Sequence, residues 1–211
     1  MVQSNVTTRE FRAGTSGWCA SDLDDPAVDR LWDENRLEMI EGVLVEMPPA
    51  RFDHGEVVYR MLRMVEDHMV GQGHDVRVST DADLVVDDDT VLRADGMVLL
   101  GGDVDRQRAR LVELDRDTGQ VGRLIVAPTL VIEAASPGHE RHDFEVKRRR
   151  YAAVGVPHYW IVSLSQRSLL CLSLDQGRYR EDARGQGEGE VRPAALPGLV
   201  IRLKDVFRSP R

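Results

Sequence analysis

The sequence predicts an α/β protein in which a mixed sheet is flanked by helices. Apolar side chains recur at helical spacing over residues 54–70, and two glycines follow this segment. Strand-like patterns come next, and residues 130–132 form a continuous apolar run that is typical of a fully buried strand. A second helix is expected at residues 139–154, before further strands. This order of helix, strands, helix and strands is typical of a mixed sheet with helices packed on it.

The first part of the chain is predicted to contain an arm and a short helix. Residues 1–24 show no apolar periodicity and are expected to form a flexible arm, followed by a single domain over residues 25–211. Asp25 followed by Pro26 is typical of the N-cap and the first position of a helix.

The remaining segments are assigned from their turn residues and polarity. Residues 37–47 are predicted to form a hairpin that turns at Glu41 and Gly42. The polar residues 101–123 are expected to form a solvated insertion, and the Gly- and Glu-rich residues 184–193 a loop. The other strands are expected at residues 76–78, 84–86, 91–100, 159–164 and 169–174.

Composition excludes several classes of protein. The 211 residues suit one compact domain, and no apolar run approaches the ~18 residues of a membrane span, so no membrane partner is expected. The two cysteines have no paired spacing, which fits a reducing, cytoplasmic location. The formal net charge of −8 argues against a general nucleic-acid coat protein. It does not argue against a nuclease, because a site that holds cations is itself acidic.

Three charged residues interrupt apolar patterns. Asp95 lies inside a strand candidate, where Asp is disfavoured, and Glu133 ends the apolar run, where an unpaired carboxylate is costly. Lys147 is one of only two lysines in the chain, and it shares a helix face with Phe144 and Tyr151. These two aromatic residues make that face the inward one, so Lys147 is expected to point at the sheet.

Two carboxylates at the ends of neighbouring strands, with an ammonium above them, form a chemical unit. Carboxylate oxygens hold Mg²⁺, which lowers the pKa of a bound water and neutralises charge on a phosphodiester. The lysine can position or deprotonate the attacking water. Each residue can also be purely structural: Asp95 can cap backbone groups, Glu133 can pair with an arginine, and Lys147 can pair with Asp143.

Several stretches together resemble the Uma-two family of restriction endonucleases, which belongs to the PD-(D/E)XK nuclease superfamily. The resemblance covers residues 30–207. It rests on a Glu-x-x-Ser-Pro motif, a helix with Asp, Lys and Tyr, and a Gly-Val-Pro-x-Tyr-Trp strand entry. The stretches are residues 37–47, 93–98, 130–137, 143–151 and 155–162.

The resemblance implies a restriction-endonuclease-like core and hydrolysis of phosphodiester bonds in DNA with Mg²⁺, for which Mn²⁺ is expected to substitute. It implies that Asp95 and Glu133 are the two metal-binding acids and that Lys147 is the catalytic lysine. Glu38 matches a further acidic position of the site. His54 matches a histidine at the start of the first long helix, without an assigned role.

The chain departs from the superfamily pattern at two positions. Ala94 precedes Asp95 where the superfamily has proline, a residue that shapes the strand and carries no chemistry. Ala135 stands where the superfamily places its lysine, two residues after Glu133. Lys147 must therefore reach the site from its helix.

Two functions remain open from the sequence. The first is an Mg²⁺-dependent DNA endonuclease, with RNA or branched DNA as other substrates. The second is a catalytically inactive module of the same fold that binds nucleic acid or protein, which the net charge favours. The basic run at residues 147–150 is expected to lie on a solvated helix face or against a DNA backbone. Pairing of two copies into a homodimer is also an expectation.

Overall fold

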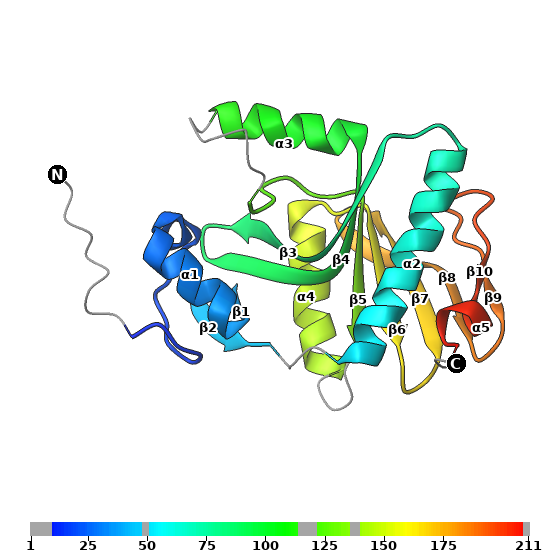
Figure 1. Cartoon of the computed structure of the whole chain (residues 1–211), viewed down its shortest axis with the longest axis horizontal. Helices are drawn as coiled ribbons and strands as arrows, with labels where there is room; N and C mark the ends of the chain where they lie inside the picture. The colour runs from blue at the N-terminus through cyan, green and yellow to red at the C-terminus, as the bar shows by residue number, and fades with distance from the viewer. Residues whose placement is uncertain (1–9, 48–50, 114–121, 136–139, 209–211) are drawn as a thin grey trace.

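A computed structural model describes residues 10–47, 51–113, 122–135 and 140–208 of the chain (Figure 1). Their strands form one large mixed sheet in the order β2-β1-β4-β5-β6-β7-β8, with β3 paired to β4, and a small sheet of β9 and β10. The neighbours β5 and β6 run parallel, and the other pairs are antiparallel. The predicted fold class is confirmed.

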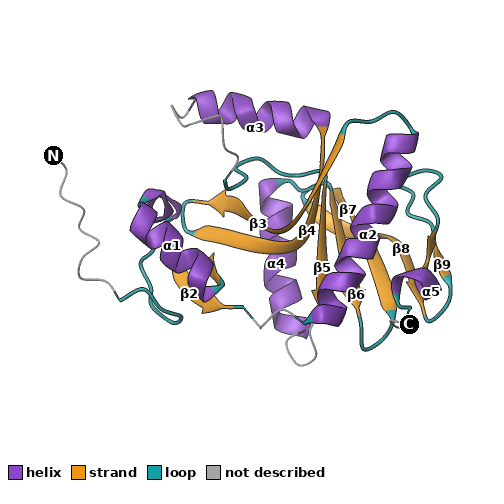
Figure 2. Ribbon diagram, viewed as in Figure 1, coloured by secondary structure: helices purple, strands orange, loops and turns teal. Residues whose placement is uncertain are grey.

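The strands and helices are clearly separated along the chain (Figure 2). The strands are β1 (Leu37–Ile40), β2 (Val43–Glu46), β3 (Val76–Asp87), β4 (Thr90–Leu100), β5 (Leu130–Ala135), β6 (His158–Ser163), β7 (Ser168–Asp175), β8 (Arg178–Gln186), β9 (Glu190–Val191) and β10 (Ile201–Arg202). The helices are η2 (Ala20–Asp24), α1 (Pro26–Asn35), α2 (Phe52–Gly71), α3 (Gly101–Glu113), α4 (Glu140–Val154) and α5 (Leu203–Val206).

Helices α2 and α4 pack on opposite faces of the sheet. In β5, Ile132 belongs to the apolar cluster that includes the inner side of α2. Its neighbour Val131 belongs to the cluster that includes Tyr151 of α4. Because successive strand residues point to opposite faces, β5 is buried on both sides, as its apolar run predicted. This burial makes the charged Glu133 in the same strand expensive unless it is compensated.

The predicted N-terminal helix and hairpin are present. The Asp25 side chain accepts a hydrogen bond from the backbone of α1, and Pro26 is its first residue. The β1–β2 turn places Glu41 at φ 53° and Gly42 at φ 72°, the left-handed conformation that such two-residue turns require. A Cβ at Gly42 would also lie 3.1 Å from the backbone oxygen of Trp18.

The described part of the N-terminal segment packs on the hairpin. Trp18 and Leu23 are buried in a cluster with Trp32 and Leu44. The backbone amide of Trp18 donates to the carbonyl of Gly42. Residues 10–24 therefore differ from the flexible arm that the sequence predicts, because these apolar side chains find distant partners. Residues 1–9 lie outside the described residues.

Two other predictions need refinement. The solvated insertion predicted at residues 101–123 begins with helix α3 (Gly101–Glu113), whose described residues are mostly exposed but which also has a buried side. Its buried Asp103 accepts hydrogen bonds from the backbone amides of Leu100 and Thr129. The predicted loop at residues 184–193 contains the end of β8 and all of β9, because polar strand residues still pair through their backbone. Residues 114–121 of the first segment lie outside the described residues.

Candidate active site

Three strands and one helix bring together the four residues that the sequence predicted for the site. Glu38 lies on β1, Asp95 on β4 and Glu133 on β5, and β4 is paired with both β1 and β5. Lys147 extends from α4 toward this part of the sheet. We call these four residues the carboxylate cluster.

The ammonium of Lys147 lies between the two glutamates. Its Nζ is 2.9 Å from Oε1 of Glu38, and it is 3.2 Å and 3.3 Å from the two carboxylate oxygens of Glu133. The side chains of Lys147, Glu38 and Glu133 are 11%, 7% and 4% exposed. Lys147 therefore faces the sheet. The alternative explanation, a solvent-exposed ion pair with Asp143 one helical turn earlier, is not needed to explain its position.

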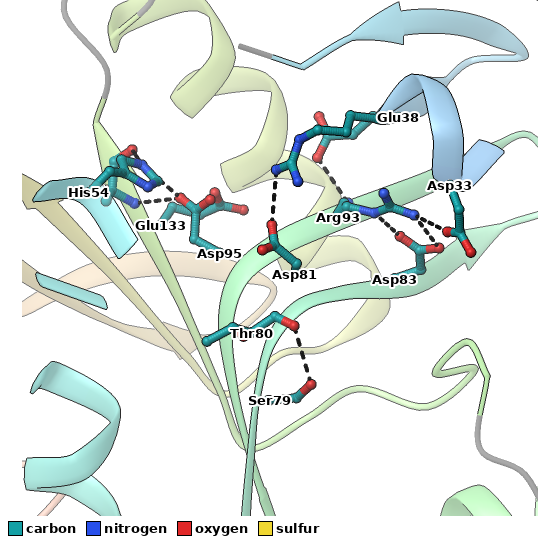
Figure 3. A network of polar contacts seen from close by, with 12 residues as sticks. Asp33, Glu38, His54, Ser79, Thr80, Asp81, Asp83, Arg93, Asp95 and Glu133 are labelled. Atoms are coloured by element: carbon teal, nitrogen blue, oxygen red, sulfur yellow. Dashed lines mark hydrogen bonds and ion pairs between the residues drawn. The ribbon is translucent and has the colours of Figure 1, made fainter. Parts of the chain in front are cut away.

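Asp95 and Glu133 lie side by side where the β4–β5 ladder ends. The last backbone pair of the ladder joins Gly96 to Ile132. One step further, the amide of Ala134 donates to Oδ2 of Asp95 at 2.8 Å, so a side chain takes the place of a strand carbonyl. The two carboxyl groups are close enough to share a hydrogen bond when one holds a proton (Figure 3).

Glu38 is fixed by the neighbouring strand. The backbone amide of Arg93 donates to its Oε1 at 2.9 Å. The Arg93 side chain points the other way and binds Asp83 with contacts of 2.7 Å and 3.2 Å. Trp32 of α1 donates to the Asp83 carboxylate at 2.8 Å, and the Arg123 side chain lies 3.4 Å from the same carboxylate. We call Trp32, Asp83, Arg93 and Arg123 the Asp83 cluster; it holds α1 against the strands beside the site.

Burial dominates the acidity of the carboxylate cluster. It raises the pKa values of Glu38, Asp95 and Glu133, although the Lys147 ammonium opposes the shift, and that of Glu133 reaches about 7. Burial alone would lower the pKa of Lys147, but the three carboxylates outweigh it and raise that pKa above its ordinary value. Lys147 therefore stays charged at neutral pH. Three carboxyl groups face one ammonium, so the fully ionised cluster carries two uncompensated negative charges.

The residues present fit a divalent cation. Mg²⁺ takes oxygen ligands and is commonly held by one or two carboxylates together with waters. Asp95 and Glu133 offer two adjacent carboxylates. The two excess negative charges of the cluster match the charge of one divalent ion. Within the described residues, no three His, Cys, Asp or Glu side chains form a metal-binding group. An ion at this place would have Asp95 and Glu133 as its protein ligands and waters as its other ligands.

Two tyrosines of the site were missed as functional residues by sequence reasoning. The hydroxyl of Tyr151 donates to Oε1 of Glu133 at 2.6 Å. The signal for it was its position one helical turn after Lys147 on the inward face. Tyr159 packs on Tyr151 at 5.2 Å between ring centroids, and among the described residues its buried hydroxyl has no hydrogen-bond partner.

The basic run of α4 divides between the interior and the protein surface. Lys147 enters the carboxylate cluster, Arg148 donates to the carbonyl of Tyr179 at 2.7 Å, and Arg150 pairs with Glu41. Arg148 and Arg150 therefore contact other segments of this chain. A contact of this run with a DNA backbone stays a prediction.

Comparisons with known proteins identify the family. The model of the Uma2 family, described as "Putative restriction endonuclease", matches residues 27–204. A crystal structure described as a "putative nuclease belonging to DUF820" from Anabaena variabilis is similar in fold. Its TM-score is 0.63 at 16% sequence identity, over 82% of this chain and 90% of that chain. No curated protein sequence matches the chain.

The structure adds one further finding: in the residues that it describes, no helix is long and apolar enough to cross a membrane. The family supports a nuclease function, that of a hydrolase acting on nucleic acid, and the structural match supports the fold. Since the family model spans most of the chain, the resemblance found in the sequence is confirmed, and the protein belongs to the Uma2 family, whose description is "Putative restriction endonuclease".

Proposed function

We propose that the protein is an Mg²⁺-dependent endonuclease that hydrolyses phosphodiester bonds in DNA, with Mn²⁺ as a substitute. One observation carries the proposal: three carboxyl groups from three strands converge on a single buried ammonium. The two excess negative charges of this cluster match the charge of a divalent ion. Membership of a restriction endonuclease family supports the same chemistry.

The residues take different roles in this reaction. Asp95 and Glu133 would hold the ion, which when bound supplies Lewis acidity and a more acidic water. Glu38 shares the Lys147 ammonium with Glu133 and holds it over the site. Of the two roles that the sequence left open for Lys147, its raised pKa supports positioning. A lysine that stays charged donates hydrogen bonds to the attacking water or to a phosphate oxygen, and does not remove a proton.

The chain offers a matched control for the test, because Lys147 and the exposed Lys204 are its only lysines. We expect wild type and Lys204→Ala to nick supercoiled plasmid DNA in the presence of Mg²⁺. Lys147→Ala should lose at least a hundredfold in rate, about the contribution of one preorganised electrostatic group. Equal nicking by both variants would refute the assignment of Lys147. Single-stranded RNA and branched DNA in parallel assays define the substrate.

A non-catalytic binding module is the second candidate. The ion pairs of Lys147 with Glu38 and Glu133 and the net charge of −8 favour it, because a closed cluster can be purely structural. The two candidates differ in their response to Mg²⁺. A module of this kind would show no rise of melting temperature with Mg²⁺ and no nicking, in both wild type and Asp95→Asn.

A further inference from the structure

His54 stands at the start of α2 and contacts two strands. Its Nε2 lies 2.9 Å from the carbonyl oxygen of Ala134 and 3.4 Å from Oδ2 of Asp95 (Figure 3). A carbonyl oxygen can only accept a hydrogen bond, so Nε2 carries a proton and donates. Oδ2 of Asp95 lies within ion-pair distance of the same nitrogen. The geometry therefore fixes His54 as a donor to Ala134 and places its ring against Asp95.

Both polar backbone atoms of Ala134 belong to this arrangement. Its amide donates to Oδ2 of Asp95 and its carbonyl accepts from His54. The three residues form a ring of contacts that joins β4, β5 and α2 at the end of the β4–β5 ladder. Oδ2 of Asp95 therefore accepts the Ala134 amide and lies 3.4 Å from Nε2 of His54, while neither of these two contacts involves Oδ1.

This ring lies on the more open side of the carboxylate cluster. The side chains of His54 and Asp95 are 17% and 15% exposed, against 4% for Glu133. A cation that enters from solvent thus meets Asp95 before Glu133. A freely rotating carboxylate at that position would present either oxygen, or neither, toward Glu133.

We infer that His54 is a positioning residue: it holds Oδ2 of Asp95, together with the Ala134 amide, so that Oδ1 faces Glu133 as a ready-made ligand for a divalent cation. The inference rests on the metal site of the proposed function. Groups that orient a metal ligand without touching the ion typically change metal affinity 10–100-fold when they are removed.

Two amide replacements separate this role from simple packing. The side-chain nitrogen of Gln reaches about as far as Nε2 of histidine, whereas that of Asn reaches only about as far as Nδ1. His54→Gln should therefore keep the donor at Asp95 and Ala134, and His54→Asn should lose it. If His54 only filled space at the start of α2, the Mn²⁺ affinities of His54→Gln and His54→Asn would not differ in this order.

The test measures binding of Mn²⁺ to the full-length protein by the electron paramagnetic resonance signal of free Mn²⁺. We expect His54→Ala and His54→Asn to bind 10–100-fold more weakly than wild type, and His54→Gln within about threefold of it. Melting temperatures in EDTA report folding of each variant. Equal Mn²⁺ affinities of all four proteins would overturn the inference while leaving the metal site intact. The same holds if the losses of Mn²⁺ affinity follow the melting temperatures and His54→Gln does not bind more tightly than His54→Asn. A wild type that binds no Mn²⁺ would overturn both the inference and the metal-dependent function.

The histidine itself gives a second readout that needs no metal. Donation from Nε2 requires either the Nε2-protonated neutral ring or the imidazolium. ¹⁵N NMR of wild type above pH 8 should therefore show the Nε2-protonated tautomer. A ring protonated only at Nδ1 would contradict the contact with Ala134 and with it the positioning role.

Discussion

Two buried ionic clusters meet at β4, where Arg93 belongs to one and Asp95, two residues later, to the other. The clusters differ in their balance of positive and negative charge. In the Asp83 cluster, one buried carboxylate receives Arg93, Arg123 and the indole of Trp32. In the carboxylate cluster, Asp95 and two glutamates share the single ammonium of Lys147. The difference does not come from burial of the carboxylates, since the side chains of Asp83 and Glu38 are 8% and 7% exposed.

The difference separates a structural ion cluster from a functional one. A buried charge costs several kcal/mol unless partners replace its water, and the Asp83 carboxylate has donors for both oxygens. It gains nothing from a further cation. The fully ionised carboxylate cluster retains two excess negative charges, of which a proton on Glu133 would remove one and a divalent ion both. Incomplete compensation is therefore the feature that marks a binding site.

The largest expected effect comes from replacing one carboxylate of each cluster by its amide. Asp83→Asn removes the one buried carboxylate that the two guanidinium groups of its cluster share and leaves them the more exposed Asp33 and Asp29, so it should lower the free energy of unfolding by about 3 kcal/mol. Glu133→Gln removes excess charge and should leave stability unchanged or raise it at pH 8 in EDTA. Urea unfolding of both variants measures the contrast. Equal destabilisation would mean that the two clusters are both structural.

These clusters also show what the sequence could predict. Asp95, Glu133 and Lys147 were identified because each violates the apolar pattern around it, and such violations persist when chemistry requires them. Glu38 came only from the family resemblance. The Asp83 cluster was not predicted: Arg93 also interrupts the apolar pattern of β4, but its partners come from other segments of the chain and no local pattern links them.

The elements that were missed depend on long-range contacts. Helix α3 has a mostly polar sequence, and its buried Asp103 accepts the amide of Thr129 from a distant segment as well as the nearby amide of Leu100. Strand β8 is nearly all polar, yet its backbone completes the ladder of β7. Trp18 finds its partners in α1 and the hairpin. Local periodicity carries no information about such contacts.

The next effect is the response to Mg²⁺. Binding at 100 times the dissociation constant stabilises the folded state by about 2.7 kcal/mol, which for a chain of this size raises the melting temperature by about 5–10 °C. We expect this rise in wild type and its loss in Asp95→Asn. The Arg184→Ala variant, which breaks an exposed pair with Glu181, should keep it. A rise that survives in Asp95→Asn would place the cation elsewhere.

The contribution of Glu133 to the stability of the metal-free protein should fall as the pH rises from 4.5 to about 7.5, and it should be constant above that range. Burial raises the pKa of Glu133 to about 7 from its ordinary 4.5, so the folded state holds a proton that the unfolded state releases. That contribution is complete below pH 4.5 and is lost as the pH passes 7. His158, whose pKa burial lowers from 6.5, adds the opposite slope below pH 6.5, and a comparison of wild type with Glu133→Gln cancels this effect.

Thermal unfolding in EDTA across the window should show the decline in wild type and a flatter curve in Glu133→Gln. Saturating Mg²⁺ should remove the decline, since the ion replaces the proton as the compensating charge. Identical pH dependence of wild type and Glu133→Gln would show that Glu133 is already compensated, like Asp83.

The smallest effect is expected from Tyr151→Phe, which changes the compensation of Glu133 without removing a charge. The Tyr151 hydroxyl donates to Glu133 at 2.6 Å and lowers its pKa against the larger effect of burial. Loss of a hydrogen bond worth about 1 kcal/mol should raise that pKa by less than one unit. The acid side of the Mn²⁺-binding profile should shift to higher pH by the same amount. The ring still packs against Tyr159, so an unshifted profile would mean that Tyr151 serves packing alone.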